Sequence, residues 1–162
     1  ALFYNTTGAN NTAIGHSALN SNTTGNSNTA IGRYALSQNT TGYNNVAILD
    51  GLASNTIGTN NIAIGGRTLR NNTSGSFNIA LGYAALNTNI TGSHNIALGN
   101  RAESGDFSYS VILGKDATAT ANNQFVVGAQ YTNVGTVVAS GYSSTKYWEV
   151  MINGVLEKIL LA

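Results

Sequence analysis

The 162-residue chain contains no cysteine and no proline, and only 8% of its residues are charged. The lack of cysteine excludes disulfides, thiolate metal sites and cysteine nucleophiles. A net charge of +1 gives no reason to expect nucleic acid as a partner, and without an apolar run of ~18 residues we expect no membrane insertion. Asparagine, threonine, serine and glycine supply the polarity instead, a composition typical of a solenoid or fibre built from stacked neutral residues.

The dominant feature of the sequence is a repeat. The segment Asn-Ile-Ala-Leu-Gly at residues 78–82 returns at residues 95–99, seventeen residues later. Two sets of glycines follow this period, which shortens to about fifteen and then fourteen residues near the end. The first set is Gly15, Gly32, Gly65, Gly82, Gly99, Gly114 and Gly128, with Leu49 in the missing position; the second is Gly8, Gly25, Gly42, Gly58, Gly75, Gly92 and Gly105. A period of this length indicates a solenoid, with two turns per coil and room for two short strands.

The first strand of each coil is predicted to read Asn-x-Ala-Ile before the glycine. Its asparagines would stack into a ladder along the solenoid; they are Asn11, Asn28, Asn45, Asn61, Asn78 and Asn95, followed by Ser110 and Gln124. The apolar residues two apart share one face of the strand, and the alanine between them points to the other. A strand that is apolar on both faces is expected to be buried on both.

The second predicted strand, beginning at Ala18-Leu19, Ala35-Leu36 and their equivalents, offers few apolar residues to cover that second face. A single roll would therefore expose an apolar stripe along its whole length, which soluble monomers rarely do. We expect identical chains to associate around a common axis and so bury it.

The last part of the chain leaves the repeat, which divides the sequence into a β-roll domain at residues 1–130 and a C-terminal region at residues 131–162. Two strand-like runs flank Asn153-Gly154, the strongest short-range hairpin signal. We predict that this hairpin interlocks between subunits and caps the open end of the roll, as the terminal repeats of solenoids require.

The segments "NNTAIGHSAL", "FNIALGYAAL" and "YSVILGKDATATA" resemble the head repeats of YadA-like trimeric autotransporter adhesins. The resemblance implies a left-handed parallel β-roll and a homotrimer. The seventeen-residue variant is similar to repeats of bacteriophage tail fibres and tailspikes. The sequence shows neither the stalk and membrane anchor of the adhesins nor the self-cleaving chaperone domain of many phage fibres. Its end resembles the distal tip of a phage-type fibre, which favours the phage interpretation.

Few groups in the sequence could perform chemistry, and we predict no catalytic residue, no metal site and no cofactor. Glu103, Asp106 and Asp116 fall on adjacent coils, as a glycosidase pair would, although a solvated rim is the plainer interpretation. His16 and His94 lie five coils apart, roughly 24 Å at ~4.8 Å per coil, too far to share a metal within one chain.

The turns carry the residues that interrupt the repeat, and exposed aromatic rings beside amides and guanidinium groups are typical of a sugar site. A cover for seams between subunits is the structural alternative. The candidate ligand-binding residues are Tyr34, Tyr43, Phe77, Tyr83, Arg67 and Arg101.

These patterns together predict an all-β, left-handed parallel β-roll (solenoid) of about eight coils with a C-terminal β-hairpin cap, assembled as an elongated homotrimer. The predicted function is the receptor-binding distal part of a bacteriophage tail fibre in the virion, which attaches to a glycan or protein receptor on a bacterial surface. The alternatives are the head of a trimeric adhesin on a bacterial cell surface and a purely structural spacer. Adjacent threonines at the second turn, such as Thr23-Thr24, leave ice binding as a further alternative, although ice-binding strands usually carry Thr-x-Thr.

Overall fold

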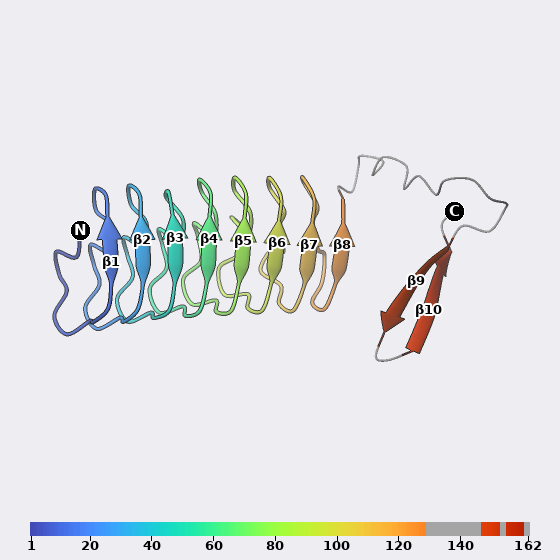
Figure 1. The fold of residues 1–162 in the computed structure, drawn as a ribbon, viewed down its shortest axis with the longest axis horizontal. Coiled ribbons are helices and arrows are strands. Elements are labelled where there is room, and N and C mark those ends of the chain that lie inside the picture. Colours follow the sequence, from blue (N-terminus) through green and yellow to red (C-terminus); the bar gives the residue numbers. More distant parts are fainter. Residues whose placement is uncertain (129–146, 153–154, 161–162) are drawn as a thin grey trace.

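The computed structural model describes residues 1–128 with their side chains, and the backbone of residues 147–152 and 155–160. Residues 1–128 form a parallel β-solenoid of about seven turns, in which eight short strands lie side by side in chain order (Figure 1). The strands are β1 (Thr12–Ile14), β2 (Thr29–Ile31), β3 (Val46–Ile48), β4 (Ile62–Ile64), β5 (Ile79–Leu81), β6 (Ile96–Leu98), β7 (Val111–Leu113) and β8 (Phe125–Val127). The count is slightly lower than the eight coils predicted, because eight strands enclose seven complete circuits. Within the described residues there is no helix, and hence none that could cross a membrane.

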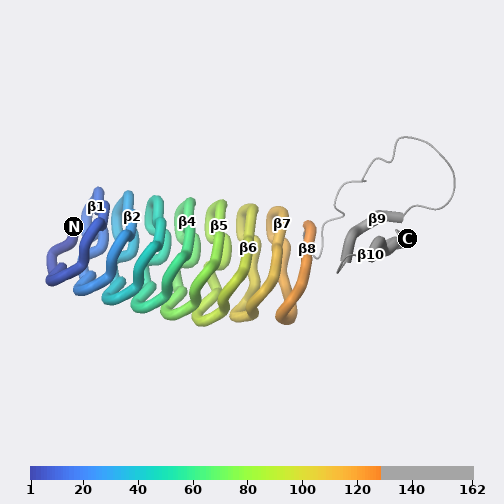
Figure 2. Tube along the Cα trace, turned by 60° about the horizontal axis from the view of Figure 1, so that its bottom comes forward, coloured from blue at the N-terminus to red at the C-terminus, as the bar shows by residue number. Residues whose placement is uncertain are grey.

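Every strand pairs in parallel with the next in an unshifted register, which confirms the alignment on the first glycine set. Thr12 faces Thr29, Ala13 faces Ala30 and Ile14 faces Ile31, and the same correspondence holds as far as β8. Figure 2 shows the consequence: successive coils repeat the same narrow outline and advance along one axis. Each residue type is therefore stacked on its equivalent in the neighbouring coil.

This close stacking explains the first glycine set. Gly82 has a φ of 122°, and a Cβ placed there would approach the carbonyl oxygen of Gly99 in the next coil to 2.7 Å. Real side chains do not tolerate such contacts, so the position requires a residue without a Cβ. Leu49, the exception in the set, adopts a different left-handed conformation with a φ of 69°.

The core of the solenoid is thin. Its principal side chains are the central alanines of the strands, replaced by Ile112 in β7, and a column of fully buried leucines. The leucines are Leu19, Leu36, Leu52, Leu69 and Leu86.

The prediction of a second strand at these leucines is wrong. Each leucine has a φ between 49° and 53°, a left-handed conformation that bends the chain instead of extending it. The bend turns the leucine side chain inward, while the backbone still bonds to the next coil, as Leu19 N does to Ala35 O at 3.0 Å. Each coil therefore has one strand, and the rest of its circuit consists of turns.

The predicted asparagine ladder is confirmed. The backbone N–H and the side-chain Nδ2 of Asn45 both donate to Oδ1 of Asn28, at 3.0 and 3.1 Å, and Nδ2 also donates to the carbonyl of Gly58 at 2.8 Å. Equivalent bonds recur from Asn28 to Asn78. Because these side chains are buried, every amide must find partners inside the protein, and stacked identical coils supply them.

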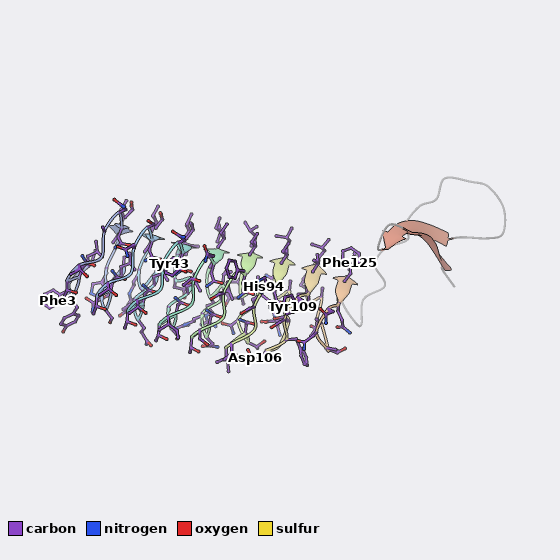
Figure 3. The ribbon with its side chains drawn as sticks, turned by 90° about the horizontal axis from the view of Figure 1, so that it is seen from below. Phe3, Tyr43, His94, Asp106, Tyr109 and Phe125 are labelled. Atoms are coloured by element: carbon purple, nitrogen blue, oxygen red, sulfur yellow. The ribbon has the colours of Figure 1, made fainter. Side chains whose placement is uncertain are left out.

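The first and third side chains of β1–β8 point away from the core and form what we call the outer face. Their exposure in the isolated chain ranges from partial to large, with Ile14 59% and Phe125 67% accessible. Figure 3 shows Phe125 projecting from the strand side of the solenoid, while Asp106 lies on the opposite side. The apolar stripe expected from the sequence is thus present on the single chain.

Beyond the solenoid, β9 (Tyr147–Ile152) and β10 (Val155–Leu160) pair in an antiparallel arrangement, with Val155 opposite Ile152 and Leu160 opposite Tyr147. The predicted turn at Asn153-Gly154 and the predicted boundary between residues 130 and 131 lie outside the described residues. The capping role of this hairpin stays a prediction.

Candidate functional site

The six candidate ligand-binding residues lie on two different edges of the solenoid. Tyr34, Arg67, Tyr83 and Arg101 belong to the turns that follow the strands, whereas Tyr43 and Phe77 precede the strands. We call these the first-turn edge and the pre-strand edge. The first-turn edge comprises His16-Ser17, Arg33-Tyr34, Asp50, Gly66-Arg67, Tyr83-Ala84, Asn100-Arg101 and Lys115-Asp116; the pre-strand edge comprises Tyr43-Asn44, Thr59-Asn60, Ser76-Phe77, Ser93-His94 and Ser108-Tyr109.

The two edges lie at opposite ends of the strands. Within one coil, Phe77 and Tyr83 are separated by five residues that include the strand β5. The candidate set therefore divides into four residues on the first-turn edge and two on the pre-strand edge.

On the first-turn edge, arginines lie against tyrosine rings. The guanidinium carbon of Arg33 lies 4.6 Å from the centre of the Tyr34 ring, and Nη2 of Arg33 donates to the Tyr34 hydroxyl at 3.2 Å. Arg67 approaches the Tyr83 ring at 6.0 Å. Such cation–π contacts contribute about 0.5–1 kcal/mol at exposed sites and favour these positions of the two side chains. This edge offers ordered aromatic and cationic groups to a ligand.

On the pre-strand edge, three rings from consecutive coils stack on one another. The rings of Phe77 and His94 are 4.9 Å apart and inclined by 18°, and those of His94 and Tyr109 are 4.8 Å apart and inclined by 13°. Figure 3 shows His94 and Tyr109 next to each other along the axis. A sugar packs on the face of a ring. His94 covers one face of the Phe77 ring, and the remaining surface of this 51% exposed side chain is what a ligand can reach.

Two acidic residues, Asp50 and Asp106, have a role that the sequence did not indicate: their carboxylates replace backbone carbonyls where a coil is short. In regular coils, the second residue that the first-turn edge takes from each coil donates its backbone N–H to a carbonyl of the preceding coil. Tyr34 N, for example, donates to His16 O at 2.9 Å. The turn after β3 has one residue fewer, and there the Oδ1 atom of Asp50 accepts the N–H of Arg67 at 2.7 Å.

Asp106 performs the same role at the second turn. In earlier coils one threonine carbonyl, such as that of Thr23, accepts three consecutive N–H groups of the neighbouring turn. The coil after β6 is shorter, and Oδ1 of Asp106 accepts the N–H groups of Ile90, Thr91 and Gly92 at 2.9, 2.6 and 2.9 Å, while Oδ2 accepts the Thr91 hydroxyl at 2.9 Å. Burial raises the pKa of this carboxyl, but the four hydrogen bonds outweigh it and hold the pKa below its ordinary value.

Glu103 reaches the adjacent backbone. Its Oε1 accepts the N–H of Asn87 at 3.1 Å, and its Oε2 accepts the N–H and hydroxyl of Thr88 at 3.2 and 2.9 Å. Here burial dominates over the hydrogen bonds and raises the pKa of the carboxyl above its ordinary value. Asp116 instead lies 3.6 Å from Arg101 and 3.3 Å from Lys115. The three acids that fall on adjacent coils thus each contact different groups.

The histidines contact aromatic rings. The His16 ring meets Tyr34 edge-on at 5.6 Å, and His94 lies inside the ring stack. In the part of the chain that the structure describes, no three metal-binding side chains come together.

The structure contains a second asparagine ladder that was not predicted from the sequence. Asn22, Asn39, Asn55, Asn72 and Asn89 each donate Nδ2 to Oδ1 of the equivalent asparagine one coil earlier, at 2.8–2.9 Å. The signal was present, since each of these asparagines lies three residues before a glycine of the second set. The threonines beside them also bond to the next coil, as Thr23 Oγ1 does to Thr40 O at 3.0 Å.

Comparisons with known proteins add no assignment: no protein-family model matches the chain, and neither a curated protein nor a solved structure matches it significantly. The structure establishes a parallel β-solenoid consistent with a β-roll. The resemblance to YadA-like heads stays an expectation that rests on the repeat residues alone.

Proposed function

We propose that this chain is the receptor-binding, distal part of a bacteriophage tail fibre, which works as an elongated homotrimer and attaches to a glycan on a bacterial surface. In this proposal the solenoid is a left-handed β-roll, the hairpin of β9 and β10 caps its end, and the first-turn edge carries the receptor contacts. The exposed apolar outer face is the observation that supports the proposal most strongly.

The outer face has the properties of an interface between copies of the chain. Two side chains from each of the eight strands form it, and all of these except Thr12 and Thr29 are apolar. Seven of the fourteen apolar side chains are 36–67% exposed and the other seven are less exposed, so covering each would contribute ~0.7 kcal/mol on average, and all of them ~10 kcal/mol before the costs of association. The stripe repeats at the spacing of the strands, and a second copy of the same solenoid has the same spacing.

Three copies would also explain how sites of low individual affinity can attach a fibre to a bacterial cell. Each first-turn edge presents ordered aromatic rings and arginines, and three linked edges raise the overall avidity without a new contact. The head of a bacterial adhesin would use the same surfaces. A spacer that binds nothing is favoured by one observation, the stack of Phe77, His94 and Tyr109, whose rings pack on one another.

The first test is the mass of the purified chain in solution, measured by light scattering at several concentrations. We expect a stable species near three times 16.7 kDa. Leu98→Asn on the outer face should shift it toward monomer, whereas Ile90→Asn, at a similarly exposed apolar residue of the second turn, should not. A monodisperse monomer at all concentrations would contradict the trimer.

The second test is adsorption to bacterial cells. Replacing Tyr34 and Tyr83 with alanine should reduce adsorption while leaving the melting temperature within a few degrees of the parent. Adsorption that survives both substitutions would favour the spacer.

A further inference from the structure

The first-turn edge is interrupted by a shallow pocket of about 450 Å³ between the coils of β2 and β4. Its lining residues are Arg33, Tyr34, Leu49, Asp50, Gly66 and Arg70. The volume is within the usual range of small-molecule sites, ~300–1,000 Å³. We call this pocket the notch.

Two local departures from the repeat create the notch. The turn after β3 is one residue shorter than its neighbours, so nothing occupies the place that Tyr34 fills one coil earlier. In the next coil Gly66 stands where other coils carry large side chains, namely His16, Arg33, Tyr83, Asn100 and Lys115. A missing residue and a missing side chain in adjacent coils hollow out the edge.

The lining of the notch is cationic and aromatic. Arg33 is held by its contacts with the Tyr34 ring and hydroxyl. Arg70 is 45% exposed, and its Nη1 lies 4.0 Å from Oδ2 of Asp50, a distance too long for a strong ion pair. Oδ1 of Asp50 is already bonded to the N–H of Arg67. Two arginines against one carboxylate leave the notch with a net positive charge.

We infer that the notch binds an acidic monosaccharide unit, a pyranose that carries a carboxylate, within a bacterial surface polysaccharide. The guanidinium groups of Arg33 and Arg70 are suited to a carboxylate, with which arginine forms charge-assisted, often bidentate bonds. The Tyr34 ring and Leu49 offer apolar surface to the C–H face of the sugar, and Oδ2 of Asp50 can accept from a hydroxyl. This inference rests on the proposed function and names its ligand class.

The inference is tested by titrating the full chain with glucuronate, glucose and glucose 6-phosphate, monitored by saturation-transfer NMR and calorimetry. Glucuronate should bind at least tenfold more tightly than glucose, because only the acid uses the arginines. Equal binding of glucuronate and glucose would overturn the inference. So would tighter binding of the phosphate ester, since the notch would then select phosphate.

Two variants place the ligand in the notch. Gly66→Tyr introduces the side chain that the next coil carries at Tyr83 and fills the notch without changing its charge. A Cβ at Gly66 meets nothing closer than 3.5 Å, and Gly66 does not have a left-handed φ, so the fold should tolerate it. Arg70→Gln removes a charge from the lining, and Asn71→Ala changes the exposed residue next to Arg70 in the chain, which is outside the lining.

Gly66→Tyr and Arg70→Gln should each weaken glucuronate binding at least fivefold, while Asn71→Ala should leave it unchanged. Glucuronate that binds Gly66→Tyr as tightly as the parent would overturn the inference. A trimer that adsorbs to cells without binding glucuronate would refute the notch alone. A chain that binds glucuronate in the notch but does not adsorb to cells would refute the attachment function alone.

Discussion

Replacing Asp106 by asparagine should locally weaken the second turn of the β5 coil. The carboxylate accepts three backbone N–H groups and one hydroxyl. Asparagine keeps one oxygen, loses the charge and presents an NH₂ group where Oδ2 accepted the hydroxyl of Thr91. Bonds to a charged acceptor are worth ~1.5–3 kcal/mol against ~0.5–1.5 for neutral ones. Because Asp106 is exposed and water competes, we expect a loss of ~1 kcal/mol for Asp106→Asn and ~2 kcal/mol for Asp106→Ala.

The loss should depend on pH in a defined direction. The folded-state pKa of Asp106 is lower than the unfolded one, so the unfolded chain binds more protons in the interval between them. The contribution of Asp106 is therefore complete above the unfolded-state pKa, near 3.9, and disappears as the pH falls through the folded-state pKa. Asp106→Asn should remove this part of the acid sensitivity.

Hydrogen exchange at the amides of Ile90, Thr91 and Gly92 is the most direct assay, because solenoids open locally and a global midpoint averages over many coils. Urea unfolding at one protein concentration gives the total free energy. Asp116→Asn is the matched control, since its partners are exposed lysine and arginine side chains and surface pairs contribute little. Unchanged exchange at the three amides in Asp106→Asn would refute the role assigned to this carboxylate.

Three further predictions concern the ladders, the glycines and Glu103. Asn55→Ala should cost ~2–4 kcal/mol in urea unfolding, because it removes a buried amide with partners on three sides, whereas Asn71→Ala, at an exposed asparagine, should cost under ~1. Gly82→Ala should lower the melting temperature through its clash with the next coil, whereas Gly66→Ala should leave it nearly unchanged. Because the pKa of Glu103 is raised in the folded chain, the folded chain binds this proton at a higher pH than the unfolded chain does. The free energy of unfolding of the parent should therefore rise relative to that of Glu103→Gln when the pH is lowered from 7 to near 5. An unchanged difference would contradict the raised pKa.

The sequence predicted the features that depend on the period. Residues one coil apart must stack in a solenoid, so the strand positions, the buried alanines, the ladder from Asn11 to Asn95 and the exposed outer face all followed from the spacing of the glycines. The second strand was predicted wrongly because alternation suggests extended backbone, and nothing in the letters Ala-Leu reveals a left-handed φ. In this fold the stacking of leucines stabilises a conformation that an isolated leucine disfavours.

The candidate site was predicted only in part. Tyr34, Arg67, Tyr83 and Arg101 do share an edge, because equivalent positions of a repeat must align. That Phe77 packs against His94 depends on ring orientation, which the repeat does not specify. The notch required the three-dimensional register, since a missing residue matters only when the coils on either side of the gap are in place.

By itself, the sequence determined the all-β class, the coil period and the residues that stack, because identical residues at a constant spacing have one way to bury their polar amides and apolar side chains together. Only the tertiary structure decided which acids replace missing carbonyls and where the edge is hollow. Asp50, Glu103 and Asp106 resemble surface carboxylates in the sequence. Asp50 and Asp106 accept N–H groups whose equivalents bond to backbone carbonyls in the regular coils, and Glu103 accepts the N–H groups of Asn87 and Thr88. Unpaired N–H groups are costly, and where they lie depends on how neighbouring coils of unequal length meet.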